Sequence, residues 1–112
     1  MAQQQQPEFR NEKEIVSHFQ ALRQRVQETN TKVAELNGDL AEHDVVLKAL
    51  EPMDAKRKCF RLIGDVLVER NVGEVMPAVR KNRENLESAV KQLQEAGKQQ
   101  ETELQEFQVR NG

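Results

Sequence analysis

Apolar residues recur along most of the chain at spacings that alternate between four and three, which is the pattern of a coiled-coil seam. This pattern predicts a first helix over residues 8–51, because Pro52 disfavours helical geometry in the residue before it. Gly38 lies inside this helix and costs about 1 kcal/mol relative to alanine, which we expect the long seam to outweigh. Only Thr29 and His43 interrupt the apolar series, which runs Ile15, Phe19, Leu22, Val26, Thr29, Val33, Leu36, Leu40, His43, Leu47 and Leu50.

A second stretch of the same period predicts a helix over residues 72–109. Asn71 is a candidate N-cap for it, with Glu74 three residues later as the partner in a capping box. Pro77 falls in the early turns, so we expect it to kink the helix or to shift its start. The seam is weaker than the first because polar residues and a glycine enter the series, which runs Val79, Arg83, Leu86, Val90, Leu93, Gly97, Gln100, Leu104 and Phe107.

Between the two helices the apolar pattern changes to a period of two, which indicates β-strands. Gly64 and Asp65 stand between two apolar runs, and a glycine first in a two-residue loop favours a type II′ turn. The segment therefore predicts a β-hairpin over about residues 59–70. The expected cross-strand pairs are Ile63 with Val66, Leu62 with Leu67, and Arg61 with Val68.

Apolar side chains would occupy both faces of this hairpin, and a lone two-stranded hairpin is only marginally stable in water. It would also expose its strand edges to other chains. We therefore expect strands of other subunits to cover Phe60, Leu62, Ile63, Val66, Leu67 and Val68.

Two helices joined by a short hairpin must run antiparallel if they pair within the chain. The approximate opposite pairs would be Leu36 with Leu86 and Phe19 with Leu104. The predicted fold class is thus all-α dominated, a long antiparallel two-helix coiled coil with a short β-hairpin at the hinge.

Composition agrees with long helices, because charged residues make up 32% of the chain and Trp and Tyr are absent. Residues 1–7 are rich in Gln and are expected to form a disordered tail before a single domain over residues 8–112. The net charge of −2, without a basic stripe, argues against a nucleic-acid partner. No apolar run approaches the roughly 18 residues that span a bilayer, so no membrane partner is expected. A single cysteine, Cys59, fits a reducing setting in the cytoplasm or the nucleus.

The residues that usually carry chemistry do not form a catalytic or metal-binding constellation. His18 lies off the seam, whereas His43 lies on it as a polar residue that would set the register rather than bind a metal. Cys59 stands among the basic residues 56–58 and Arg61, but without His and Asp partners a packing role is favoured over a reactive thiol. We expect no enzymatic activity.

The central segment closely resembles the β-class subunits of prefoldin. The resemblance rests on RKCFRLIGDVLVERNV at residues 57–72 and EVMPA at residues 74–78, and on EL at residues 35–36 and EHDVVLKAL at residues 42–50 upstream. It covers about residues 12–110, and Asp65 departs from it where a second Gly is expected.

This resemblance implies a hetero-hexamer of two α-class and four β-class subunits, whose hairpins assemble into β-barrels from which the coiled coils hang. It implies an ATP-independent co-chaperone that holds unfolded actin and tubulin chains and delivers them to the cytosolic chaperonin, with no nucleotide, metal or other cofactor. It also places client binding at the coil tips, where the weakening seam should let the helices loosen. The candidate client-binding residues are Phe9, Ile15, Phe19, Leu104, Phe107 and Val109. The alternative is a structural coiled-coil adaptor or tether without chaperone activity.

Overall fold

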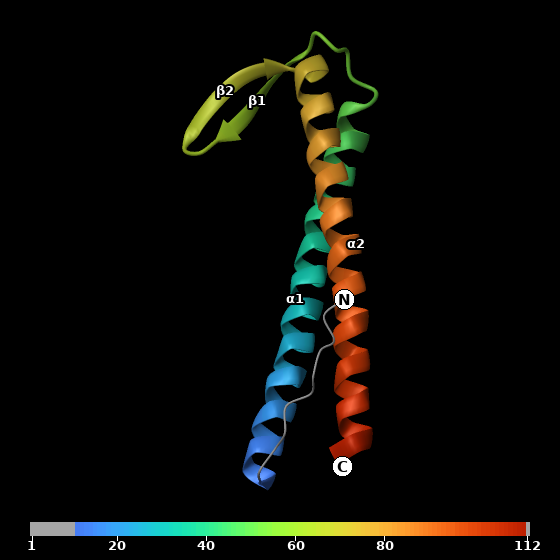
Figure 1. Cartoon of the computed structure of the whole chain (residues 1–112). Coiled ribbons are helices and arrows are strands. Elements are labelled where there is room, and N and C mark those ends of the chain that lie inside the picture. The colour runs from blue at the N-terminus through green and yellow to red at the C-terminus, as the bar shows by residue number, and fades with distance from the viewer. Residues whose placement is uncertain (1–10, 112) are drawn as a thin grey trace, which may run out of the picture.

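The computed structural model describes residues 11–111, which form two long helices with a two-stranded hairpin between them (Figure 1). The elements are α1 (Glu12–Leu50), β1 (Lys58–Ile63), β2 (Val66–Asn71) and α2 (Val72–Asn111). The molecule is rod-shaped, with principal extents of 67 × 28 × 24 Å. The predicted fold class is confirmed, while the tail expected over residues 1–7 and Phe9 lie outside the described residues.

Helix α1 begins at Glu12, so the predicted start at residue 8 was wrong. Asn11 has extended backbone geometry, with φ −158°, and its side-chain oxygen accepts a hydrogen bond of 2.9 Å from the N–H of Glu14. Acidic residues in the first turn, Glu12 and Glu14, suit the positive end of the helix dipole. A cap of this kind is a local signal that the apolar periodicity does not reveal.

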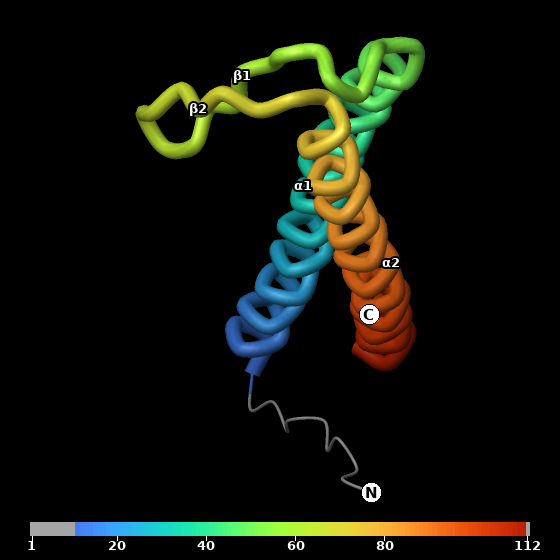
Figure 2. Tube along the Cα trace, turned by 90° about the horizontal axis from the view of Figure 1, so that it is seen from above, coloured from blue at the N-terminus to red at the C-terminus, as the bar shows by residue number. Residues whose placement is uncertain are grey.

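The hairpin forms with the register that the sequence predicts: Ile63 pairs with Val66, Leu62 with Leu67, and Arg61 with Val68. Gly64 has a φ of +61°, and no other described residue has a positive φ, so that of Asp65 is negative. This combination matches a type II′ turn and excludes type I′, which needs a positive φ at both turn residues. Figures 1 and 2 show the hairpin extending sideways, away from the helix pair.

Helix α2 follows β2 directly and contains Pro77 without any shift of its start. Asn71 caps it as predicted, because its side-chain oxygen accepts a hydrogen bond of 2.9 Å from the N–H of Glu74. The helix continues to Asn111, slightly beyond the predicted end at Val109.

The two helices pair antiparallel, but their register differs from the predicted one by about one turn. Phe19 stacks on Phe107 rather than on Leu104, with ring centroids 6.4 Å apart. The hydroxyl of Thr29 donates a 2.8 Å hydrogen bond to the side-chain oxygen of Gln100, so two polar interruptions of the seams meet each other.

Gly97 belongs to the same layer, and the helices approach closely there. A Cβ at this position would lie 3.4 Å from Cγ2 of Thr29. Gly97 is itself buried, as are Leu22, Val90 and Phe107, while most other seam residues are half-buried. A pair of helices buries only one narrow stripe on each partner, which explains the small number of fully buried side chains.

Candidate functional site

The first candidate site is a groove of about 290 Å³ at the free end of the coiled coil. Helix α1 contributes three apolar side chains and α2 contributes an aromatic ring and two amides. The lining residues are Ile15, Val16, Phe19, Phe107, Gln108 and Asn111. The groove is therefore apolar at its centre and has neutral hydrogen-bonding groups at its edge.

Phe107 is the anchor of this groove, because the helix pair buries it to 3% exposure. Its ring centroid lies 4.9 Å from that of His18, tilted by 52°, and 6.4 Å from that of Phe19. The guanidinium of Arg23 lies 5.8 Å from the centroid of Phe19, within reach of a cation–π contact. The side chain of Asn111 donates a 3.2 Å hydrogen bond to the carbonyl of Phe107 and closes the end of α2.

The two helices draw apart toward their free ends in both views of the molecule (Figures 1 and 2). The aromatic rings occupy this wider space, so the helices remain in contact as far as Phe107. His18 was assigned to a position off the seam, and the structure corrects this, because its ring packs on Phe107 and is half-buried. A large ring such as that of Phe107 reaches a residue beside the seam, which an assignment based on an ideal seam does not foresee.

Only part of the predicted client-binding set comes together in the groove. Ile15, Phe19 and Phe107 line it, whereas Leu104 is half-buried elsewhere along the interface. Val109 is 83% exposed and borders a separate shallow surface of α2. Phe9 lies outside the described residues.

Sequence reasoning missed one apolar member of the groove. Val16 is 52% exposed at the groove wall. Its signal in the sequence was an apolar residue directly beside the seam position Ile15, near the end of the helix.

The second candidate site is the hairpin, whose apolar side chains remain open in the single chain. Phe60, Leu62 and Leu67 share one face and are 62%, 69% and 63% exposed. On the opposite face Ile63 and Val66 are also exposed, near the turn, while Val68 is half-buried. Five of the six predicted assembly residues thus present apolar surface to solvent in a segment that stands clear of the helices.

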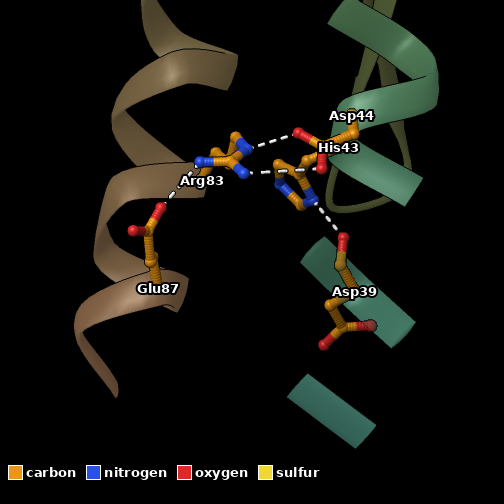
Figure 3. Close-up of polar contacts among 5 residues, drawn as sticks. All are labelled: Asp39, His43, Asp44, Arg83 and Glu87. Atoms are coloured by element: carbon orange, nitrogen blue, oxygen red, sulfur yellow. Dashed lines mark hydrogen bonds and ion pairs between the residues drawn. The ribbon is translucent and has the colours of Figure 1, made fainter. Parts of the chain in front are cut away.

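A polar network links the helices between these two ends (Figure 3). Arg83 of α2 pairs with Asp44 of α1, and its Nη1 donates a 2.7 Å hydrogen bond to Glu87. The hydrogen bond from Arg83 holds the pKa of the Asp44 carboxyl below its usual value, and Arg83 with Lys91 does the same to the pKa of Glu87. The hydrogen bonds that Arg83 donates to Asp44 and Glu87 raise the pKa of its guanidinium.

His43 is half-buried on the seam, and its role in setting the register stays a prediction. Its Nδ1 lies 2.7 Å from the carbonyl oxygen of Asp39 in its own helix, so this nitrogen carries the proton and donates. The polar contact between the helices is made by the neighbouring Asp44. The long side chain of Arg83 reaches across the seam to Asp44, and its position in the seam pattern does not reveal this contact.

Two kinds of site are absent from residues 11–111. In this range no three His, Cys, Asp or Glu side chains gather closely enough to hold a metal ion. Neither helix has an apolar window long enough to cross a bilayer. Cys59 is a free thiol, half-buried in β1.

The family model of prefoldin subunits matches residues 13–111, nearly the whole described chain. The chain belongs to the prefoldin subunit family. The resemblance read from the central segment is thereby confirmed, and membership implies a role in chaperone-assisted protein folding.

Relatives of this prefoldin subunit extend over most of its length. It is 36% identical over 103 residues to probable prefoldin subunit 2 of Dictyostelium discoideum, which covers 92% of this chain and 89% of that protein. It is 36% identical over 100 residues to prefoldin subunit 2 of Arabidopsis thaliana, covering 89% of this chain and 68% of that protein. With prefoldin subunit 2 of Homo sapiens the identity is 40% over 102 residues, covering 88% and 64% respectively.

The fold of this prefoldin subunit matches a solved structure as well. The crystal structure of the prefoldin beta subunit from Thermococcus strain KS-1 superposes with a TM-score of 0.78, covering 88% of this chain and 86% of that chain. The sequence identity is 15%, so this match concerns the fold alone. The match includes most of the chain, because only 12% of the chain lies outside the superposed residues.

Proposed function

We propose that this prefoldin subunit is one member of a hetero-hexamer of two α-class and four β-class subunits that holds unfolded polypeptides at the tips of its coiled coils. Unfolded actin and tubulin chains are the proposed clients, and the cytosolic chaperonin receives them. Family membership supports the chaperone role. The observation that carries the proposal is the placement of two apolar surfaces, the hairpin and the groove, at opposite ends of a rod 67 Å long.

The hairpin supports the assembly half of the proposal. A two-stranded sheet with apolar residues on both faces gains stability only when other strands or helices cover it. The helices of the same chain do not cover it, because the hairpin extends away from them (Figure 2). Strands from other prefoldin subunits offer the complementary edges and faces.

The groove supports the holding half. The six described residues that line it carry no charge, so the groove offers apolar contact without selecting a particular charge pattern in the client. A groove of this size contacts only a few side chains of a client, so each tip binds weakly. Several tips that act on one chain raise the overall avidity above any single affinity.

Holding by apolar contact involves no bond making or breaking, so the proposal requires no catalytic residue, nucleotide or metal. It places the protein where its proposed clients and the chaperonin are found, in the cytoplasm, with the nucleus as a further compartment. The alternative, a coiled-coil adaptor without chaperone activity, makes a different prediction for the groove, because it needs no contact there with unfolded chains.

Photocrosslinking from two valines of the same helix tests the proposal. Val16 lines the groove, and Val45 lies on α1 near the hinge with an even larger exposure of 67% against 52%. A photoreactive residue at position 16 of the assembled complex should capture unfolded actin, and one at position 45 should capture little. Equal capture at the two positions would contradict tip binding, and capture at neither would favour the adaptor.

A further inference from the structure

The hairpin and the coiled coil meet without a spacer. β2 ends at Asn71 and α2 begins at Val72, so one continuous backbone passes from strand into helix (Figure 1). Val72 is 1% exposed. Rotation about this junction would bring its side chain into water and lose the free energy of burying it, so the junction is held in one conformation.

The loop that enters the hairpin is tied to the same junction. The N–H of Val72 donates a 3.0 Å hydrogen bond to the carbonyl of Arg57, and the N–H of Gly73 donates one of 2.9 Å to the carbonyl of Ala55. The first N–H groups of a helix have no partner within the helix itself. Here the hinge loop supplies those partners, so the start of α2 and the entry to β1 move together.

A side chain at Gly73 would press on the hinge loop and displace it by a few tenths of an ångström. A Cβ there would lie 3.3 Å from both the Cβ and the carbonyl oxygen of Ala55. The φ of Gly73 is not positive, so alanine is compatible with its backbone conformation and only the contact opposes it. Ala55 cannot retreat freely, because its carbonyl oxygen accepts the hydrogen bond from Gly73.

We infer that Gly73 is a positioning residue, whose missing side chain seats the hinge loop on α2 and so sets the angle at which the coiled coil leaves the hairpin. The inference rests on the proposed function, in which the hairpin is fixed in an assembly and several tips reach one client. A tilt of about 10° at the joint moves the far end of a helix of about 60 Å by roughly 10 Å. A small change at Gly73 thus alters the spacing of the tips and their joint grip on a client.

Gly38 provides a matched control, because it lies inside α1 where a methyl group meets no neighbour. A Cβ at Gly38 would meet nothing within 4 Å. Both substitutions, Gly73→Ala and Gly38→Ala, add the same methyl group to α-helical backbone, and only the first meets the hinge loop.

The test follows the angle between the hairpin and the coiled coil through a distance, measured in the complex assembled from the full chain and the other prefoldin subunits. Spin labels at Asp65→Cys in the hairpin turn and Glu84→Cys on α2, in a Cys59→Ser background, report the distance between hairpin and coil. Gly73→Ala should shift this distance by about 2–3 Å, because Glu84 lies about 18 Å along α2 from the joint, and it should lower the suppression of actin aggregation severalfold. Gly38→Ala should leave both unchanged, and adding Ala55→Gly to Gly73→Ala should restore part of the original distance.

An unchanged distance in Gly73→Ala would overturn the inference. If Gly73→Ala does not assemble, the double variant with Ala55→Gly decides: recovery of assembly supports the contact, and failure to recover overturns it. A wild-type complex that does not suppress aggregation would refute the proposed function and leave the distance measurement valid for the joint.

Discussion

Arg83 of α2 and Asp44 of α1 form a two-point ion pair across the coiled coil, in which Nε and Nη2 of the arginine donate to different oxygens of the carboxylate. The arginine also holds Glu87, so one cation connects an acidic residue of each helix. A guanidinium suits this role because its donors lie in a fixed plane and can serve two carboxylates at once. The apolar seam alone permits more than one alignment of the two helices, and this ion pair favours one of them.

The ion pair predicts how stability depends on pH. The folded-state pKa values of Asp44 and Glu87 lie below the usual pKa of a carboxyl group, which is about 4. Their contribution is therefore complete above about pH 5 and is lost as the pH falls through the folded pKa values. Asp44→Asn should lower the melting temperature at pH 7, and the difference from wild type should narrow as the pH falls below about 4.

The control for this experiment is Glu35→Gln, which removes the exposed pair between Lys32 and Glu35, whose charged atoms are 3.8 Å apart. Exposed pairs of this kind contribute little to stability, so the melting temperature should hardly change. Circular dichroism at several pH values measures both variants. A gap between Asp44→Asn and wild type that persists unchanged at pH 3 would contradict the assignment.

The register of the coil predicts which cysteines can form a disulfide. A Cβ at position 97 lies 3.4 Å from Cγ2 of Thr29, which is close to the geometry that a disulfide requires. In a Cys59→Ser background, Thr29→Cys with Gly97→Cys should crosslink within one chain on oxidation. Thr29→Cys with Leu93→Cys, one turn away, should not. Non-reducing electrophoresis distinguishes them, and equal crosslinking would show that the register is not unique.

Phe107 and Val109, two apolar residues near the end of α2, differ in burial. Phe107→Ala should destabilise the tip by about 3–5 kcal/mol in local opening free energy, because a nearly buried ring is lost and a cavity remains. Val109→Ala should change it by less than about 0.5 kcal/mol, since Val109 is 83% exposed. Amide hydrogen exchange at the ends of α1 and α2 measures the effect. Similar protection in the two variants would rule out the packing role of Phe107.

The hairpin predicts an assembly defect without loss of the chain's own fold. Leu67 is 63% exposed in the single chain, so Leu67→Asp should leave its helical content unchanged. In the complex the added carboxylate would be buried without a partner, which is strongly unfavourable. Native mass measurement should show loss of the full-size complex, whereas Val109→Asp at the far end should assemble normally. Normal assembly of Leu67→Asp would refute the hairpin as the assembly element.

Two glycines should respond oppositely to alanine. Gly64 has a φ of +61° in the turn, where a Cβ costs about 1–2 kcal/mol, so Gly64→Ala should weaken the hairpin and lower complex yield. Gly38 lies in a helix with open space around it, so Gly38→Ala should stabilise the coil by up to about 1 kcal/mol. Thermal unfolding and complex yield measure the pair, and a stabilising Gly64→Ala would contradict the turn geometry.

Elements and turns followed from the sequence because near neighbours determine them. The period of the apolar residues defines helix and strand, and Gly64 with Asp65 defines the turn that places Leu62 opposite Leu67. The N-cap at Asn71 was also predicted from a few neighbouring residues. The predicted start of α1 was wrong because the apolar periodicity does not mark where a helix begins. Asn11, an equally local cap, does mark it.

How these elements meet depends on contacts between residues that are far apart in the sequence. A seam that repeats every few residues matches its partner almost as well after a shift of one turn, so periodicity does not fix the register. The contact of Thr29 with Gln100 and the ion pair of Asp44 with Arg83 favour one alignment, because a shift would leave these polar groups without each other. The same holds at the hinge, where the fit of Gly73 against Ala55 depends on a loop whose path is determined by both elements together. Local sequence patterns define a hairpin between two coiled-coil helices, whereas packing between distant residues sets the register of the helices and the groove at their tips.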